Sequence, residues 1–252
     1  ASLIQALTLD AGGTLFHPSR PAGLVYSEVA SRWGCRVDPA TVQERFAAAW
    51  KTWSRTDPGR TTVATPEEER AWWKALVAEV FRGCGTFADF DGFFDELFVA
   101  FASPDAWSLY PEVKATLDRL HAAHVPLAIV SNWDPRLELL CDRLGLSGYF
   151  TVILASGRVG ISKPDPRIFA EAVERLGVAA REAAHIGDSL RDDVHGALGA
   201  GLQAVWLRRS SEGMEGPPVP QAVGREPDPE DAAPRGVAVA ALLDEAVKLV
   251  VS

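Results

Sequence analysis

The sequence predicts an α/β fold in which a parallel sheet is interrupted, after its first strand, by an inserted helical domain. Three observations carry this prediction. An apolar run from Leu3 to Leu9 ends in Asp10 and paired glycines, as a buried strand does when it reaches a sheet edge. A block with helical periodicity follows, from Gly23 to about Trp107. From Tyr110 onward, short apolar runs alternate with amphipathic helices, which indicates a parallel sheet covered on both faces.

The inserted block is predicted to contain four helices, because apolar residues recur there at three- and four-residue spacing over 22–34, 39–55, 66–82 and 88–102. The third helix has a clear start: Thr65 can cap it, Pro66 fits its first position, and acidic residues follow. The block holds six of the eight tryptophans. Aromatic residues at helical spacing usually fill cores, so we expect most of these rings to be buried and a minority to face substrate.

After the helical block, the expected elements are helix 111–123, strand 126–130, helix 136–144, strand 149–154, helix 165–176, strand 183–188, helix 191–200 and strand 203–207. Residues 210–235, rich in Pro, Glu, Gly and Ala, are expected to form a flexible surface loop before a strand near 236–239 and a helix over 240–250. The expected division is a core, 1–16 and 108–252, and a helical cap, 17–107. Hinges are expected at 16–21, a linker rich in breakers, and at 104–109.

Composition narrows the class of protein. The net charge of −9 argues against nucleic acid or an anionic membrane as the main partner. The three cysteines lie far apart without a CxxC pair, which suits a reducing compartment. No apolar run approaches ~20 residues and no signal-like leader is visible, so we expect no membrane span. The expectation is a cytoplasmic protein, monomeric or weakly dimeric.

Chemistry-bearing residues follow four of the predicted strands or their loops, and the carboxyl ends of parallel strands form one ligand-binding edge. They are Asp10 with Gly12-Gly13-Thr14, Ser131-Asn132, Lys163-Pro164-Asp165, and Gly187-Asp188-Ser189 with Asp192-Asp193. Two carboxylates, Asp10 and Asp188, could hold Mg²⁺, which prefers oxygen ligands. Ser131, the amide of Asn132 and the Lys163 ammonium could neutralise a phosphoryl group. Asp10 could also attack phosphorus.

In these four motifs, taken in order along the chain, the sequence resembles the haloacid dehalogenase-like (HAD) hydrolase superfamily, in its members with a helical cap after the first strand. The resemblance implies a Rossmann-like core, hydrolysis of a small phosphorylated substrate and a Mg²⁺ cofactor. It implies catalytic roles for Asp10, Ser131 and Lys163. Phosphate binding is expected at Gly13, Thr14, Ser131, Asn132 and Lys163, and metal binding at Asp10, the carbonyl of Gly12, Asp188 and Asp193. Asp193 is preferred to Asp192 because the Val194-His195-Gly196-Ala197 run after it resembles the family's small-residue run.

The first motif departs from the family pattern at Gly12. Family phosphatases usually carry DxDxT, whose second Asp protonates the leaving oxygen, and glycine cannot donate a proton. General acid catalysis contributes roughly 10²–10⁴-fold, so activity is expected to be weak or limited by the leaving group, unless a residue such as His17 supplies the proton.

Three interpretations stand. The favoured one is a Mg²⁺-dependent phosphatase. The second is a haloacid-type dehalogenase, although such enzymes typically place a tyrosine at this position and need no metal. The third is a non-catalytic protein that binds a phosphate ligand or a partner.

Overall fold

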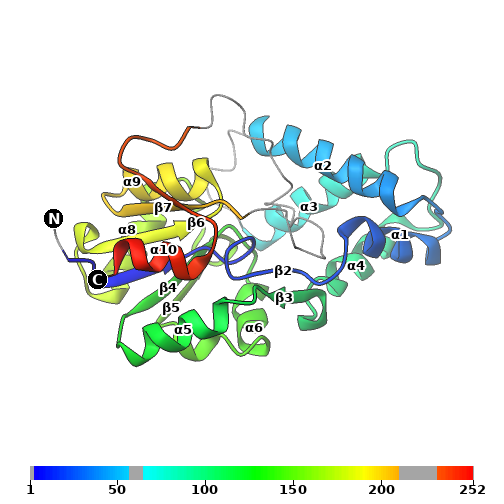
Figure 1. The fold of residues 1–252 in the computed structure, drawn as a ribbon. Coiled ribbons are helices and arrows are strands. Elements are labelled where there is room, and N and C mark those ends of the chain that lie inside the picture. The colour runs from blue at the N-terminus through cyan, green and yellow to red at the C-terminus, as the bar shows by residue number, and fades with distance from the viewer. Residues whose placement is uncertain (1–2, 57–64, 210–231, 252) are drawn as a thin grey trace.

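A six-stranded sheet forms the centre of the computed structural model, which describes residues 3–56, 65–209 and 232–251. Its strand order is β5-β4-β1-β6-β7-β8, and every neighbouring pair is parallel. The strands are β1 (Ala6–Leu9), β4 (Leu127–Ser131), β5 (Val152–Ala155), β6 (Ala183–Gly187), β7 (Gln203–Leu207) and β8 (Ala238–Ala240). The predicted α/β fold is confirmed (Figure 1).

Helices cover both faces of this sheet, and alternate strand residues enter two separate cores. Leu7, Leu9 and Ile129 pack in the cluster that includes residues of α5 (Val113–Ala122), α6 (Arg136–Arg143) and α10 (Leu243–Val250). Ala128 and Val130 pack in the cluster that includes residues of α8 (Pro166–Leu176) and α9 (Gly196–Gly199). This alternation follows from the two-residue period of a strand. It explains why the strands read as continuous apolar runs.

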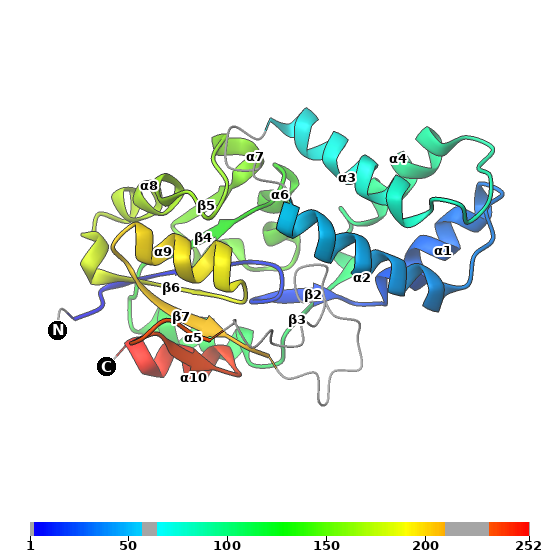
Figure 2. The same ribbon diagram turned by 90° about the horizontal axis from the view of Figure 1, so that it is seen from above.

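Four further helices pack together beyond the carboxyl ends of the strands, at the end of the molecule away from the N-terminus (Figure 2). They are α1 (Ala22–Arg32), α2 (Pro39–Thr56), α3 (Pro66–Val80) and α4 (Phe90–Ala100). Their apolar faces share a third cluster, with Phe46, Phe93 and Phe94 among its fully buried members. The capping box expected at α3 is present between Thr65 and Glu68. We therefore propose the division into a core, 1–16 and 108–252, and a cap, 17–107.

The two chain segments that join core and cap form regular structure. β2 (Phe16–Pro18) pairs antiparallel with β3 (Trp107–Leu109), so that His17 lies opposite Ser108. The linker predicted at 16–21 therefore begins with a strand, which the sequence did not indicate. Pro18 argued against a strand, because proline cannot donate a backbone hydrogen bond. At the end of a short two-stranded ribbon, however, a proline costs little hydrogen bonding. The ribbon carries both crossings between the cap and the core.

Several short elements were not predicted: the 3₁₀ helices η2 (Pro104–Ala106), η3 (Ser147–Tyr149) and η4 (Ala180–Glu182), and the helix α7 (Ser156–Val159). The helix expected over 191–200 is split into a π-helical segment, η5 (Leu190–His195), and α9. Most of the predicted loop 210–235 lies outside the described residues. Among the helices that the structure describes, none has both the length and the apolar character needed to cross a membrane.

Candidate active site

A buried lysine joins two buried aspartates at the carboxyl edge of the sheet. Lys163 Nζ lies 2.7 Å from Asp10 Oδ1 and 2.5 Å from Asp193 Oδ1. Asp10 follows β1, Lys163 lies in the loop before α8, and Asp193 lies in η5 after β6. All three side chains are at most 3% exposed. The structure thus brings together three residues that the sequence separates by 153 and 30 positions.

The backbone of Lys163 is held by the side chain of Asn132. Asn132 Nδ2 donates to the Lys163 carbonyl at 2.9 Å, and the Lys163 N–H donates to Asn132 Oδ1 at 2.7 Å. The peptide bond that follows, Lys163–Pro164, is cis. Ser131 lies next to Asn132 at the end of β4 and is fully buried. The Asn132 amide therefore serves first to position the lysine, a role that the sequence did not reveal.

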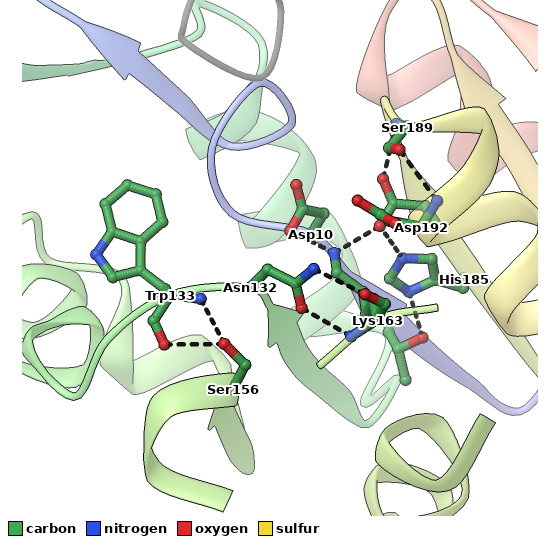
Figure 3. A network of polar contacts seen from close by, with 10 residues as sticks. Asp10, Asn132, Trp133, Ser156, Lys163, His185, Ser189 and Asp192 are labelled. Carbon is green, nitrogen blue, oxygen red and sulfur yellow. Dashed lines mark hydrogen bonds and ion pairs between the residues drawn. The ribbon is translucent and has the colours of Figure 1, made fainter. Parts of the chain in front are cut away.

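Asp193 is fixed by a chain of hydrogen bonds that reaches back into the sheet (Figure 3). Asp193 Oδ1 lies 3.1 Å from His185 Nε2, and His185 Nδ1 lies 2.8 Å from Thr8 Oγ1. Asp193 Oδ2 accepts from the Ser189 N–H at 2.8 Å. Because His185 lies on β6 and Thr8 on β1, two neighbouring strands orient this carboxylate. This contact gives His185 a positioning role, which no sequence motif indicated.

A third carboxylate, Asp188, completes an acidic group with Asp10 and Asp193. One oxygen atom from each of the three lies within 4.8 Å of the others. Among the acidic, histidine and cysteine side chains of the described residues, these three are the group close enough together to hold a metal ion. The group contains Asp193 rather than Asp192. Asp188 Oδ1 is buried and has no hydrogen-bond partner among the described residues. A buried carboxylate oxygen in this condition is costly unless a cation reaches it.

The charged groups of the cluster shift one another's pKa values. Burial raises the pKa of Asp10, although Lys163 opposes the shift. Burial, and then the charges of Asp10 and Asp193, raise the pKa of Asp188 well above its usual range. Burial would also raise the pKa of Asp193, but Lys163 and His185 hold it well below the usual range. Burial alone would lower the pKa of Lys163, yet Asp10 and Asp193 raise it. One ammonium therefore faces three carboxylates, and the group favours a further cation.

Glycines let the loop after β1 approach the acidic group. Gly13 has φ +80°, and a Cβ at this position would lie 2.5 Å from Asp188 Oδ2. The Gly13 N–H donates to the Phe16 carbonyl at 2.9 Å, which closes the turn. Gly12 lies one residue earlier on the same loop and has no positive φ. Thr14 is fully buried, and its Oγ1 has no hydrogen-bond partner among the described residues.

Arg209 supports this loop from the far end of the chain, and no sequence motif indicated it. Its Nη2 donates to the Thr14 carbonyl at 2.7 Å and its Nε to the Gly13 carbonyl at 3.1 Å. Glu112 pairs with the same guanidinium at 2.7 Å, and the Tyr110 ring lies 3.5 Å from it. Since Arg209 occupies both carbonyl groups, the loop is held in one position next to the carboxylates.

These features can be compared with known proteins. The haloacid dehalogenase-like hydrolase family model matches residues 4–201. The chain belongs to this family. It is 35% identical over 210 residues to haloacid dehalogenase-like hydrolase domain-containing protein 3 of Mus musculus, a match that covers 82% of this chain and 83% of the mouse protein. The chain is therefore a haloacid dehalogenase-like hydrolase.

Two other proteins are similar to this chain. A phosphoserine phosphatase of Thermus thermophilus is 43% identical over 106 residues, which cover 41% of this chain and 42% of that protein. The L-2-haloacid dehalogenase of Xanthobacter autotrophicus superposes with a TM-score of 0.72 over 98% of both chains, at 23% identity. The second similarity shows the shared fold alone.

Proposed function

We propose that this hydrolase is a Mg²⁺-dependent phosphatase of small phosphate esters, with Asp10 as the nucleophile. The observation that carries the proposal is the group of three carboxylates with one buried, unpartnered oxygen on Asp188. A reaction that needs no metal would not require such an arrangement, whose net negative charge opposes the approach of an anionic substrate. The similarity to a phosphoserine phosphatase supports the same choice.

The donor set suits Mg²⁺. Asp10, Asp188 and Asp193 offer hard carboxylate oxygens, and the carbonyl of Gly12 lies on the adjoining loop. The residues that would hold the ion are Asp10, Gly12 and Asp188, with Asp193 in support. The bound ion would supply positive charge to the carboxylates and to the phosphoryl oxygens. Burial, and then the charges of Asp10 and Asp193, raise the pKa of Asp188, and this agrees with the assignment because a bound cation would offset these costs.

The residues of the chain then account for the steps of the reaction. A carboxylate oxygen of Asp10 attacks phosphorus, the bond from phosphorus to the ester oxygen breaks, and an aspartyl-phosphate forms. Water hydrolyses this intermediate, which releases inorganic phosphate and restores Asp10. Lys163 holds Asp10 at 2.7 Å and adds positive charge to the phosphoryl site, where Ser131, Thr14 and the backbone N–H of Asn132 bind oxygen atoms. Gly13, expected to bind phosphate, instead shapes the loop, because its N–H already donates to the Phe16 carbonyl.

Protonation of the leaving alcohol is the weak point of this mechanism. Gly12 supplies no acid, and the His17 ring lies against Tyr110, with its Nδ1 2.9 Å from the Pro18 carbonyl. We therefore expect the rate to depend steeply on the acidity of the leaving group. Nitrophenyl phosphate should be hydrolysed much faster than an alkyl phosphate.

A panel of phosphate esters and one 2-haloacid, each measured with Mg²⁺ and with EDTA, tests the proposal. We expect ester hydrolysis that EDTA abolishes and no halide release. Beryllium fluoride with Mg²⁺, a phosphoryl mimic, should also raise the melting temperature by mass action. Halide release that persists in EDTA would instead identify a dehalogenase. An unchanged melting temperature at millimolar concentrations of both additives, together with no turnover, would contradict the phosphate site.

A further inference from the structure

An aromatic pocket lies between the cap helices and the core. Tyr26 of α1, Trp50 of α2, Trp73 of α3 and Phe98 of α4 line it on one side. Trp107, at the start of β3, and Trp133, after β4, line it on the other. Two of these cap rings, Trp50 and Trp73, stack with centroids 5.8 Å apart. The described lining is mostly apolar, so an apolar molecule is more stable in contact with it than in water.

The pocket adjoins the candidate active site at Asn132. Asn132 is part of its lining, and the same side chain holds the backbone of Lys163, whose ammonium contacts Asp10. The next residue, Trp133, places its ring 5.7 Å from Phe16 and 5.1 Å from Trp107. A substrate with its phosphate at Asp10 would therefore extend past Asn132 toward these rings.

The charged groups of the described lining neutralise each other. Arg136 Nε donates to Asp134 Oδ1 at 2.8 Å, and Arg136 Nη2 donates to Asp134 Oδ2 at 2.6 Å. The third nitrogen, Nη1, donates to the Phe98 carbonyl at 2.5 Å. Both side chains are thus engaged in a bidentate pair, which leaves no uncompensated charge there for a second ionised group of a substrate.

We propose that this pocket selects phosphate esters whose leaving group is an uncharged aromatic alcohol, and that it disfavours leaving groups with an ammonium or carboxylate. The inference rests on the proposed phosphatase function. Burial of a ring against tryptophan side chains is favourable through lost water contact and ring stacking. Burial of an unpaired charge in the same place is costly. Phosphoserine, which carries both an ammonium and a carboxylate, should accordingly be a poor substrate.

The test compares 2-naphthyl phosphate with phenyl phosphate, because their leaving phenols have similar acidity and differ in apolar area. The value of kcat/KM should be about tenfold higher for the naphthyl ester, mainly through KM, and lowest for phosphoserine. Trp73→Ala should bring the naphthyl-to-phenyl ratio close to one while phenyl phosphate is still hydrolysed. Phe90→Ala is the matched control, since Phe90 is also a half-buried cap aromatic but lies outside the lining. Trp50→Ala is a second variant if Trp73→Ala does not fold.

Equilibrium binding separates this inference from the proposed function. The Asp10→Asn protein is titrated with both esters, and tryptophan fluorescence reports binding. Tighter binding of the naphthyl ester that is lost in Trp73→Ala supports the pocket assignment. This holds even if the wild type hydrolyses no ester, because the absence of hydrolysis would refute only the phosphatase function. Equal binding of the two esters, tighter binding of phosphoserine, or a naphthyl preference that survives both tryptophan substitutions would overturn the assignment.

Discussion

The acidic group and the aromatic pocket meet at Asn132 but are built on opposite principles. In the acidic group, Lys163 and Asp193 are almost fully buried and each is held by several hydrogen bonds from different strands and loops. In the pocket, Trp73 and Trp133 are only half-buried and are held by ring contacts. Polar groups in a buried network require fixed geometry, whereas ring packing tolerates many arrangements.

This difference separates chemistry from substrate choice. Four side chains at the sheet edge would determine whether the reaction occurs. Replacing Asp10, Lys163 or Asp193 also removes one partner from a buried ion pair. Many rings from four helices share the task of selecting a leaving group, so the loss of one should alter preference without abolishing turnover. Substitutions in the two regions should therefore have different kinetic signatures.

The largest effect is expected for Asp10→Asn. The change is nearly isosteric but removes the nucleophile, so kcat for nitrophenyl phosphate should fall by at least about a thousandfold. Circular dichroism should show an unchanged fold. Asp165→Asn is the control: Asp165 caps α8 through the Arg167 N–H at 3.0 Å, asparagine caps as well, and activity should persist. Retained turnover in Asp10→Asn would remove Asp10 from the mechanism.

The next prediction compares two neighbouring aspartates. Asp193→Asn leaves the buried Lys163 with one carboxylate fewer, and removal of one partner from a buried ion pair typically costs about 3–5 kcal/mol. Asp192→Asn, at a more exposed position beside it, should change the free energy of unfolding by less than about 1 kcal/mol. Urea unfolding of both variants measures the difference. Equal destabilisation would show that Asp193 is not the supporting carboxylate.

The strand-end rule was enough to predict two members of the acidic group, and the third, Asp193, was predicted from the resemblance to the family. Asp10 and Asp188 each follow a buried strand directly, and parallel strands bring such residues to one edge. The residues that hold the acidic group in place are not marked by any motif or local pattern in the sequence. His185 reads as one more residue of a buried strand, and Arg209 acts from a position 196 residues away in sequence from Gly13. Contacts of this kind depend on tertiary packing, which a single sequence does not display.

The pocket was predictable only in outline. Helical spacing indicated that most cap tryptophans are core residues and a minority face substrate, and Trp50, Trp73 and Trp107 line the pocket. Trp33 instead donates its Nε1–H to Glu96 at 2.7 Å. Which rings face the cavity depends on how the helices cross and where the β2–β3 ribbon fixes the cap. Periodicity gives the apolar face of each helix but not the angle between helices.

A smaller effect, on substrate preference alone, is expected for Gly12→Asp. Because Gly12 has no positive φ, the backbone can accept a side chain there. The new carboxyl group should donate a proton to the leaving oxygen and speed hydrolysis of alkyl phosphates by roughly tenfold, with little gain for nitrophenyl phosphate. Gly13→Ala is the contrasting variant, since its Cβ would lie 2.5 Å from Asp188 Oδ2 and activity should fall. A wild type already insensitive to leaving-group acidity would show that another donor exists.

The smallest expected effect concerns the stability of the metal-free protein. Burial, together with Asp10 and Asp193, raises the pKa of Asp188, so the folded state binds this proton more tightly than the unfolded state. Stability is therefore lost as pH rises from the ordinary aspartate pKa, about 4, through the folded-state pKa. In EDTA at neutral pH, Asp188→Asn should relieve this cost and raise the melting temperature by roughly 2–4 °C, as expected for about 1 kcal/mol in a chain of this size.

Two further measurements on the same variant decide whether the charge of Asp188 is the cause. Below about pH 4, where the carboxyl group is protonated in both states, the gain over wild type should disappear. With Mg²⁺ at neutral pH the order should reverse, because the ion stabilises the wild type by mass action and Asp188→Asn has lost a ligand. A gain that persisted at acidic pH would come from packing rather than charge. Mg²⁺ stabilisation equal in both proteins would place the ion elsewhere than at Asp188.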